Sequence, residues 1–340
     1  MPDRVSQLGG RGREPRRNRA VAASVTFLAL LTALSAAALP FASDWHDVQS
    51  LDRAVRHPPS FQPVVSPEVF DRAERRPGEA RSEERAPHGL KNIAFHLTSL
   101  LGHDDLGRSL MFRLLPAYLI SAGIGLAAAG IAMVVGVLWG MTAGLIGGRT
   151  DLIMMRVVDV LYGLPYILMV ILLRVGLTPP LSTLFHGNSP IANVVVLFVA
   201  IGSVSWLTMA RVVRGQVLSL KESGFVESAR VSGASTWRIL RRHVLPNLVA
   251  TSLTYALLVV PQAILQESFL SYLGIGIQQP TPSLGRLAAD GVEAVNTFVG
   301  FWWLLVFPCG LLVITLLALN IVGDALREWF DPKSRAATLL

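Results

Sequence analysis

The sequence has little charge, one cysteine and very little lysine. Of its 340 residues 52% are hydrophobic and 16% are charged, whereas soluble globular proteins carry roughly 25% charged residues. The single cysteine, Cys309, excludes a disulfide framework within the chain and a cysteine-based metal site. So little charge with so much apolar surface indicates that lipid solvates much of the chain.

The motifs of nucleotide hydrolysis and of common membrane hydrolases are also missing. The lysines are Lys91, Lys221 and Lys333, and none of them stands in a G-x-x-x-x-G-K-[ST] phosphate loop. Neither H-E-x-x-H nor G-x-S-x-G occurs. We therefore expect no enzymatic activity, no cofactor and no metal in this chain, and any ATP-driven step requires a separate ATPase.

Long apolar runs are abundant instead. A helix needs about 20 residues to cross the hydrocarbon core of a bilayer, and six stretches qualify: 21–42, 116–142, 152–175, 191–210, 247–268 and 302–323. The first follows an arginine-rich start and could also be a secretory signal peptide. Its apolar length from Val21 to Phe41 favours an uncleaved membrane anchor.

The basic residues predict the orientation of these spans. Short loops rich in Lys and Arg stay in the cytoplasm; residues 1–20 hold six and 211–242 hold seven, whereas 176–190 has none. This pattern explains the net charge of +7 without nucleic acid. The predicted organisation is a basic cytoplasmic N-terminus (1–20), a first transmembrane helix (21–42), a partly disordered extracytoplasmic segment (43–112), a five-helix core (113–325) containing a cytoplasmic loop (211–246), and a cytoplasmic tail (326–340).

The loop between the fourth and fifth spans has the pattern of two short helices joined by a hinge. Ser223 can cap a helix through Glu227, and Gly233 can adopt the left-handed conformation that ends it. Ser235 or Thr236 can cap a second helix that runs to Leu245 and carries one basic face, formed by Arg238, Arg241 and Arg242. These arginines could simply anchor the loop at lipid headgroups. A capped, glycine-broken helix is, however, typical of a segment that docks into a partner's groove.

Glu227-Ser228-Ala229, then Gly233 and the distal Leu245-Pro246, resembles the EAA motif of ABC importer permeases. Leu101-Gly-His-Asp-Asp-Leu-Gly-Arg108 and Glu267-Ser-Phe-Leu-Ser-Tyr-Leu-Gly274 are similar to segments of the dipeptide, oligopeptide and nickel branch of that family. Residues 50–95 depart from the branch, because they are longer and more charged than usual there.

The resemblance implies an all-α membrane protein with the type I ABC importer permease fold, six transmembrane helices and a coupling helix between spans 4 and 5. It also implies the partners: a second permease subunit, as a heterodimer, two cytoplasmic ATP-binding subunits and an extracytoplasmic solute-binding protein. The residues implied for coupling to the ATPase are Glu227, Ser228, Ala229, Gly233, Leu245 and Pro246. Peptide is the implied solute, with nickel and other small solutes as alternatives, and the implied location is the inner membrane.

Polar and small residues within the spans suggest further sites. Gln262, Gln266 and Glu267 are candidates for the translocation pathway, because polar groups at membrane depth tend to face a cavity or the bundle interior. Alternatively, Glu267 holds the loop that follows. Gly136, Gly140 and Gly144 form a small-residue stripe for close helix packing, within the subunit or between subunits.

A secondary transporter driven by an ion gradient is the main alternative class. It would need paired ionisable groups in the membrane and an internal repeat. Asp159 and Glu267 are the candidate groups, both near span ends, and no convincing repeat is found.

Overall fold

A computed structural model describes residues 14–45, 58–60, 100–185, 189–233, 235–239, 242, 244–279, 281–295 and 301–330. Most of the predicted N-terminal segment 1–20 and of the predicted extracytoplasmic segment 43–112 lies outside the described residues. The same is true of residues 331–340 in the predicted tail.

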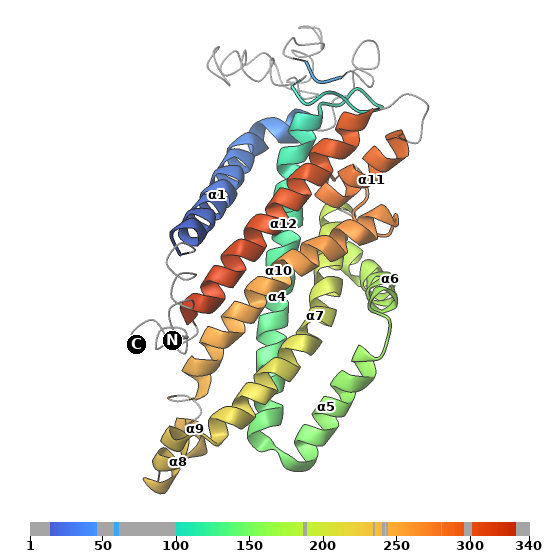
Figure 1. The fold of residues 1–340 in the computed structure, drawn as a ribbon. Coiled ribbons are helices and arrows are strands. Elements are labelled where there is room, and N and C mark those ends of the chain that lie inside the picture. The colour runs from blue at the N-terminus through green and yellow to red at the C-terminus, as the bar shows by residue number, and fades with distance from the viewer. Residues whose placement is uncertain are drawn as a thin grey trace, which may run out of the picture. The chain divides into compact units, whose positions relative to one another are not determined.

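Helices dominate the described chain (Figure 1). They are α1 (Glu14–Trp45), α4 (Leu110–Ile146), α5 (Gly148–Tyr162), α6 (Tyr166–Leu184), α7 (Ser189–Lys221), α8 (Gly224–Val231), α9 (Thr236–Ile239), α10 (Leu245–Tyr272), α11 (Leu284–Val295) and α12 (Trp302–Phe330). Within the described residues, 6 helices (α1, α4, α6, α7, α10 and α12) are long and apolar enough to span a membrane. The prediction of an all-α protein with six spans is therefore confirmed.

The predicted third span, residues 152–175, is wrong. The chain breaks between α5 and α6: Gly163 ends α5, and Pro165 has an extended ψ of 124°. A proline disfavours helical conformation in the residue before it, here Leu164. The 15 residues of α5 reach about 22 Å, less than the hydrocarbon thickness of about 30 Å. The third spanning helix is instead α6.

The chain divides into two compact units, and the first comprises the described residues within Met1–Leu28, Gly123–Gln266 and Leu316–Leu340. In this unit α4 packs tightly on α7 through the glycine stripe. A Cβ on Gly136 would lie 2.5 Å from Met209 Cβ, one on Gly144 would lie 2.8 Å from Val217 Cβ, and one on Gly140 would meet the Ala210 carbonyl oxygen. Larger residues would hold the two helices apart.

The second unit comprises the described residues within Ala29–Ala122 and Glu267–Thr315. Its core joins the first turns of α4 to α11 and α12; the buried members are Leu110, Leu114, Ala117, Tyr118, Leu284, Leu287, Ala294, Trp303 and Leu304. Thr32 on α1 and the Tyr118 hydroxyl share a 3.0 Å hydrogen bond, which ties α1 to α4.

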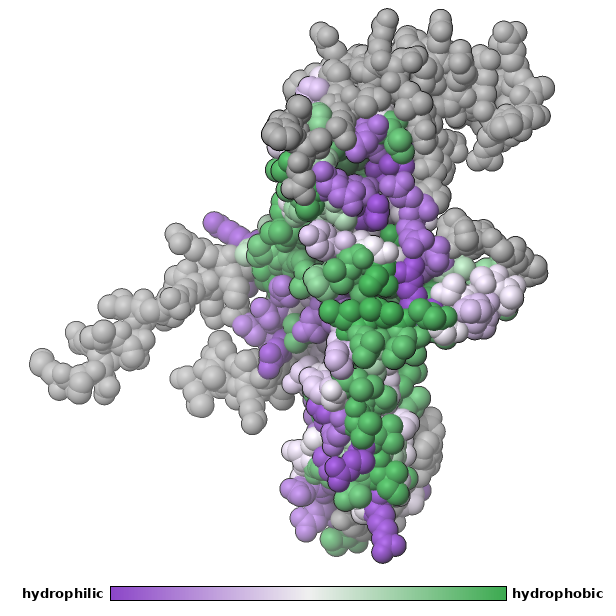
Figure 2. Space-filling view, turned by 90° about the vertical axis from the view of Figure 1, so that its right-hand side faces the viewer, coloured by the Kyte–Doolittle hydropathy of each residue, from purple (hydrophilic) through white to green (hydrophobic). Residues whose placement is uncertain are grey.

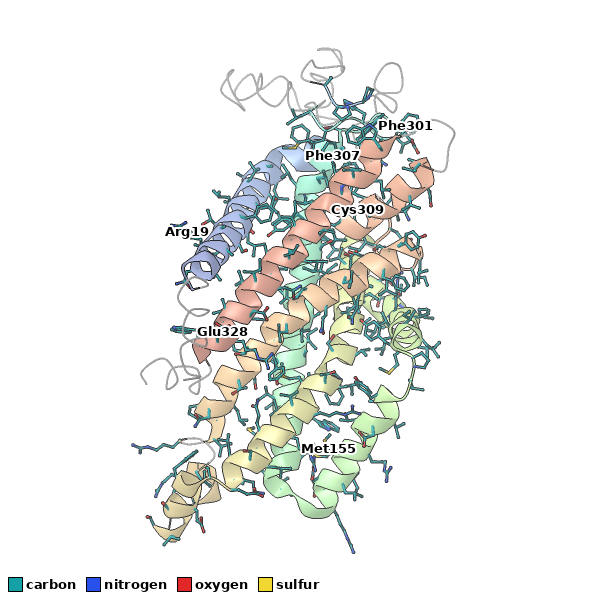
Figure 3. All side chains as sticks on the ribbon, viewed as in Figure 1. Arg19, Met155, Phe301, Phe307, Cys309 and Glu328 are labelled. Atoms are coloured by element: carbon teal, nitrogen blue, oxygen red, sulfur yellow. The ribbon has the colours of Figure 1, made fainter. Side chains whose placement is uncertain are left out.

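Many large apolar side chains remain exposed on the spanning helices. Leu126, Val134, Leu172 and Leu317 are examples, and broad hydrophobic areas cover the face shown in Figure 2. The half-buried Cys309 lies on α12 among such residues (Figure 3). Exposed apolar surface on helices of this length is what contact with lipid requires.

Candidate functional site

Helix α7 continues to Lys221, so the first part of the predicted loop 211–246 is helical. Helix α8 begins directly after Ser223, whose carbonyl oxygen accepts the Glu227 amide at 3.1 Å. The prediction that the Ser223 hydroxyl caps α8 is wrong. The hydroxyl donates instead to the Leu220 carbonyl at 2.5 Å and so satisfies one of the last carbonyls of α7.

One side of α8 is anchored and the other is open. Val226 is fully buried and packs in a cluster with Val213, Val217, Ile239 and Val244. Around it, Phe225, Glu227 and Ser228 are exposed, Ala229 is half-buried, and Val231 is 85% exposed. Exposed apolar residues beside an exposed carboxylate are suited to protein contact.

Gly233 ends this segment in the left-handed region, with φ +77°. The Ser235 hydroxyl accepts the Arg238 amide at 3.4 Å and so caps α9, as predicted. Among the described residues, helix α9 covers Thr236–Ile239. Leu245, where the second helix was predicted to end, is the first residue of α10. Arg238 and Arg242 are exposed, and Arg241 lies outside the described residues.

Proline at position 246 explains where α10 begins. Pro246 lies in the first turn of α10, where the missing amide hydrogen has no helical partner to lose. Leu245 is half-buried and Pro246 is exposed. Of the motif residues, Glu227, Ser228 and Ala229 lie within α8, Gly233 follows it, and Leu245 and Pro246 begin α10.

Two ion pairs join α5 to α7. Arg214 binds both carboxylate oxygens of Asp151, at 2.5 and 2.6 Å, and this bonding lowers the pKa of Asp151 below its ordinary value. Arg211 donates to Asp159 at 2.9 Å and lies 4.0 Å from the centre of the Tyr162 ring. Asp159 thus pairs with a residue of the neighbouring helix α7.

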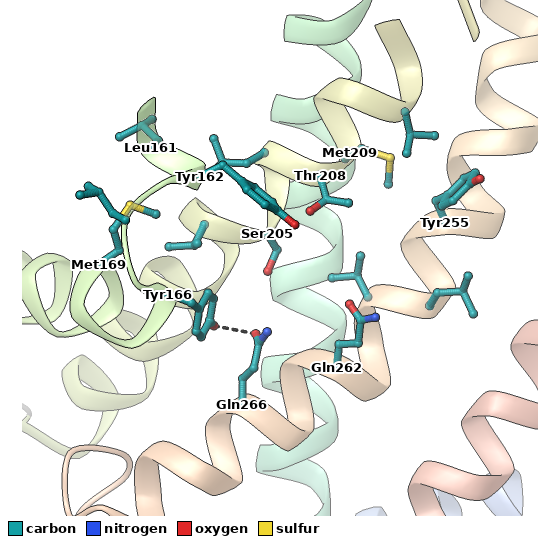
Figure 4. Close-up of a pocket in the computed structure, with 16 residues that line it drawn as sticks. Leu161, Tyr162, Tyr166, Met169, Ser205, Thr208, Met209, Tyr255, Gln262 and Gln266 are labelled. Carbon is teal, nitrogen blue, oxygen red and sulfur yellow. Dashed lines mark hydrogen bonds between the residues drawn. The ribbon is translucent and has the colours of Figure 1, made fainter. Parts of the chain in front are cut away.

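A cavity of about 590 Å³ lies in the first unit. It is lined by Leu161, Tyr162, Leu164, Tyr166, Met169, Val204, Ser205, Leu207, Thr208, Met209, Val212, Tyr255, Leu258, Val259, Gln262 and Gln266. None of these residues is an acid, a lysine, an arginine or a histidine. The Tyr166 hydroxyl donates to Gln266 Oε1 at 2.6 Å (Figure 4). The cavity therefore offers amides, hydroxyls and apolar surface.

Glu267 does not line this cavity, unlike its neighbour Gln266. Its side chain is fully buried and accepts the hydroxyls of Ser121 at 3.0 Å and Ser271 at 2.7 Å. Those serines in turn accept the backbone amides of Leu284 and Ile277, each at 3.1 Å. Side chains of successive helical residues point about 100° apart. Of the three predicted pathway residues, Gln262 and Gln266 therefore line the cavity and Glu267 does not. Glu267 holds the turn between α10 and α11.

Residues 136–336 match the family model described as "Binding-protein-dependent transport system inner membrane component". The chain belongs to this family of membrane permeases.

Related permeases share much of the sequence. The oligopeptide transport system permease protein OppC of Bacillus subtilis is 43% identical over 69% of this chain and 72% of its own length. OppC of Escherichia coli K12 is 46% identical over the same shares. The dipeptide transport system permease protein DppC of Bacillus subtilis is 43% identical over 69% of this chain and 68% of its own length.

A solved structure shows the same fold. The match is an inward-facing form of the MetNI methionine ABC transporter, with a TM-score of 0.50 and 18% identity, covering 65% of this permease and 98% of that chain. The predicted type I ABC importer permease fold is therefore confirmed.

A buried charge network in the permease was missed by sequence reasoning. Asp104 accepts from Arg108 and Arg113, each at 2.7 Å, and Asp290 lies 3.6 Å from Arg113 and 2.9 Å from Arg286. Burial raises the pKa of Asp290 above its ordinary value. The spacing of Arg286 with Asp290 on α11 carries a local signal, whereas Asp104 and Arg108 meet across a turn that precedes α4. The link through Arg113 needs tertiary structure.

Proposed function

We propose that this permease is the membrane-spanning subunit of an ABC importer for peptides or a similar small solute. The names of the relatives at 43–46% identity support peptide as the solute class. The subunit does no covalent chemistry. Its function is alternating access, a repacking of helices that is biased by ATP at a partner.

The observation that carries the proposal is the geometry of α8. This eight-residue helix is anchored on α7 by the buried Val226 and displays Phe225, Glu227 and Val231. An amphipathic helix presented in this way fits a groove on another protein. We assign that groove to a cytoplasmic ATP-binding subunit, with the residues Glu227, Ser228, Ala229, Gly233, Leu245 and Pro246 forming and framing the contact.

The rest of the assembly follows from this role. A second permease subunit completes the pore, two ATP-binding subunits hydrolyse ATP, and an extracytoplasmic binding protein delivers the solute. Residues 1–20, the loop 211–246 and the tail 326–340 face the cytoplasm, residues 43–112 face the outside, and 113–325 form the core. The short basic connections support this orientation.

The cavity is the proposed solute pathway, with Gln262 and Gln266 among its polar contacts. Its volume of about 590 Å³ lies within the range of small-ligand sites, about 300 to 1,000 Å³. Glu267 has a supporting role, because its buried carboxylate holds the turn after α10. Gly136, Gly140 and Gly144 let α4 and α7 approach closely enough to form one packed wall.

Substitution of Gly233 tests the coupling role. Valine disfavours the φ of +77°, by roughly 1–2 kcal/mol, and so redirects α9 relative to α8. Gly233→Val should abolish uptake by the reconstituted transporter while the protein still inserts in the membrane. Gly233→Asn, which tolerates the left-handed region, is the matched control and should retain uptake. Normal uptake by Gly233→Val would overturn the proposal.

A further inference from the structure

Lys221 is the last residue of α7, and its side chain reaches the end of another helix. Its Nζ donates to the carbonyl oxygens of Gly144 and Leu145, each at 3.1 Å. Helix α4 ends at Ile146. These two carbonyl oxygens are therefore among its last, which have no hydrogen-bond partner within the helix. A cation at a helix C-terminus also interacts favourably with the helix dipole.

Two further contacts lie on the same side of α7. Val217 packs against Gly144, so closely that a Cβ there would be 2.8 Å from Val217 Cβ. Arg214 forms a bidentate ion pair with Asp151, which lies in the first turn of α5. The side chains of Arg214 and Asp151 are 33% and 14% exposed, so solvent screens this pair less than a surface pair.

These contacts hold the α4–α5 hairpin on the final turns of α7. Only Glu222 and Ser223 separate Lys221 from α8, and the Ser223 hydroxyl bonds back to the Leu220 carbonyl. Val226 of α8 is in the same buried cluster as Val217. Helix α8 is therefore tied to the last turns of α7, next to Lys221.

The other end of α5 reaches the cavity. Tyr162, the last residue of α5, lines it and lies under the Arg211 guanidinium. The Arg211–Asp159 pair there is 36% and 56% exposed, which makes it the weaker connection between α5 and α7. The firmer connection between α5 and α7 is the Arg214–Asp151 pair, and Lys221 holds the end of α4 beside it.

We propose that Lys221, with the Arg214–Asp151 pair, couples the movement of α8 to the α4–α5 hairpin, so that α5 and Tyr162 follow the ATPase. Lys221 is thus a positioning residue for energy coupling. The inference rests on the proposed function, because it takes α8 as the docking helix.

The experiment measures uptake and ATP hydrolysis together in the assembled transporter reconstituted in liposomes. Lys221→Met keeps the length of the chain and removes its charge. We expect uptake per ATP hydrolysed to fall roughly tenfold, within the range measured for coupling networks, while ATP hydrolysis stays within about twofold of wild type. Lys221→Arg should restore at least half of the ratio, because guanidinium also donates to carbonyls.

The control and a second variant separate coupling from folding. Arg156→Met removes an exposed cation from α5 and should leave the ratio unchanged. Asp151→Arg combined with Arg214→Asp should recover the ratio that Arg214→Asp alone loses, even where Lys221→Met inserts poorly. An unchanged ratio in Lys221→Met overturns the inference. Failure of the double variant to recover the ratio that Arg214→Asp loses overturns it as well. Absence of uptake in the wild-type transporter would instead overturn the proposed function.

Discussion

The Tyr166 hydroxyl donates a 2.6 Å hydrogen bond to Gln266 Oε1, joining residues that are 100 positions apart in the sequence. Tyr166 is the first residue of α6, directly after the break at Pro165, and Gln266 lies on α10. The bond is therefore a consequence of the broken third span. It leaves the Gln266 amide nitrogen and the whole Gln262 amide as hydrogen-bonding groups on the cavity wall.

Replacing Tyr166 by phenylalanine removes the hydroxyl group, and with it this hydrogen bond, but keeps the aromatic ring. Loss of one such hydrogen bond is worth about 0.5–1.5 kcal/mol, so uptake should change by about twofold to tenfold. The measurement is initial uptake rate at saturating and limiting solute. Tyr255→Phe, also on the cavity wall, is the control and should have the smaller effect. Equal effects of the two variants would argue against a special role for the Tyr166–Gln266 bond.

Gly140→Ala should destabilise the permease by about 1–3 kcal/mol, the usual consequence of overpacking. The new Cβ would meet the Ala210 carbonyl oxygen of α7, which is backbone and cannot rotate away. Thermal unfolding of the detergent-solubilised protein measures the effect. Gly130→Ala is the matched control, because nothing lies within 4 Å of a Cβ at that position. A loss of stability in Gly130→Ala as large as in Gly140→Ala would refute this explanation.

The Asp151–Arg214 pair should make stability depend on pH. Arg214 lowers the pKa of Asp151 in the folded protein below the ordinary 3.8. Folding is then favoured by the carboxylate above that value, and the contribution is lost as the pH falls through the lower, native pKa. The difference in Tm between wild type and Asp151→Asn should be largest near neutral pH and shrink in acid. A difference that stays constant from pH ~7 to ~3 would contradict the ionic origin of the contact.

Composition and the lengths of the apolar runs by themselves determined that this is a multi-span helical membrane protein, because a helix that crosses lipid needs about 20 apolar residues. The residue types at Gly233 and Ser235 also determined two local features, the left-handed turn after α8 and the cap of α9. A positive φ and a helix cap depend on residue type and its near neighbours.

Only tertiary structure decided which residues act together. Gln266 and Glu267 are adjacent in the sequence, yet one lines the cavity and the other holds the α10–α11 turn through Ser121 and Ser271. The place of the third span depended on a break of the helix at Gly163–Pro165. Hydrophobicity does not reveal this break, because the residues around it form one apolar run. The partners of Lys221 are backbone carbonyls of α4. Such contacts depend on how helices pack, because any helix end offers the same carbonyl groups and the sequence does not mark which one a lysine will reach.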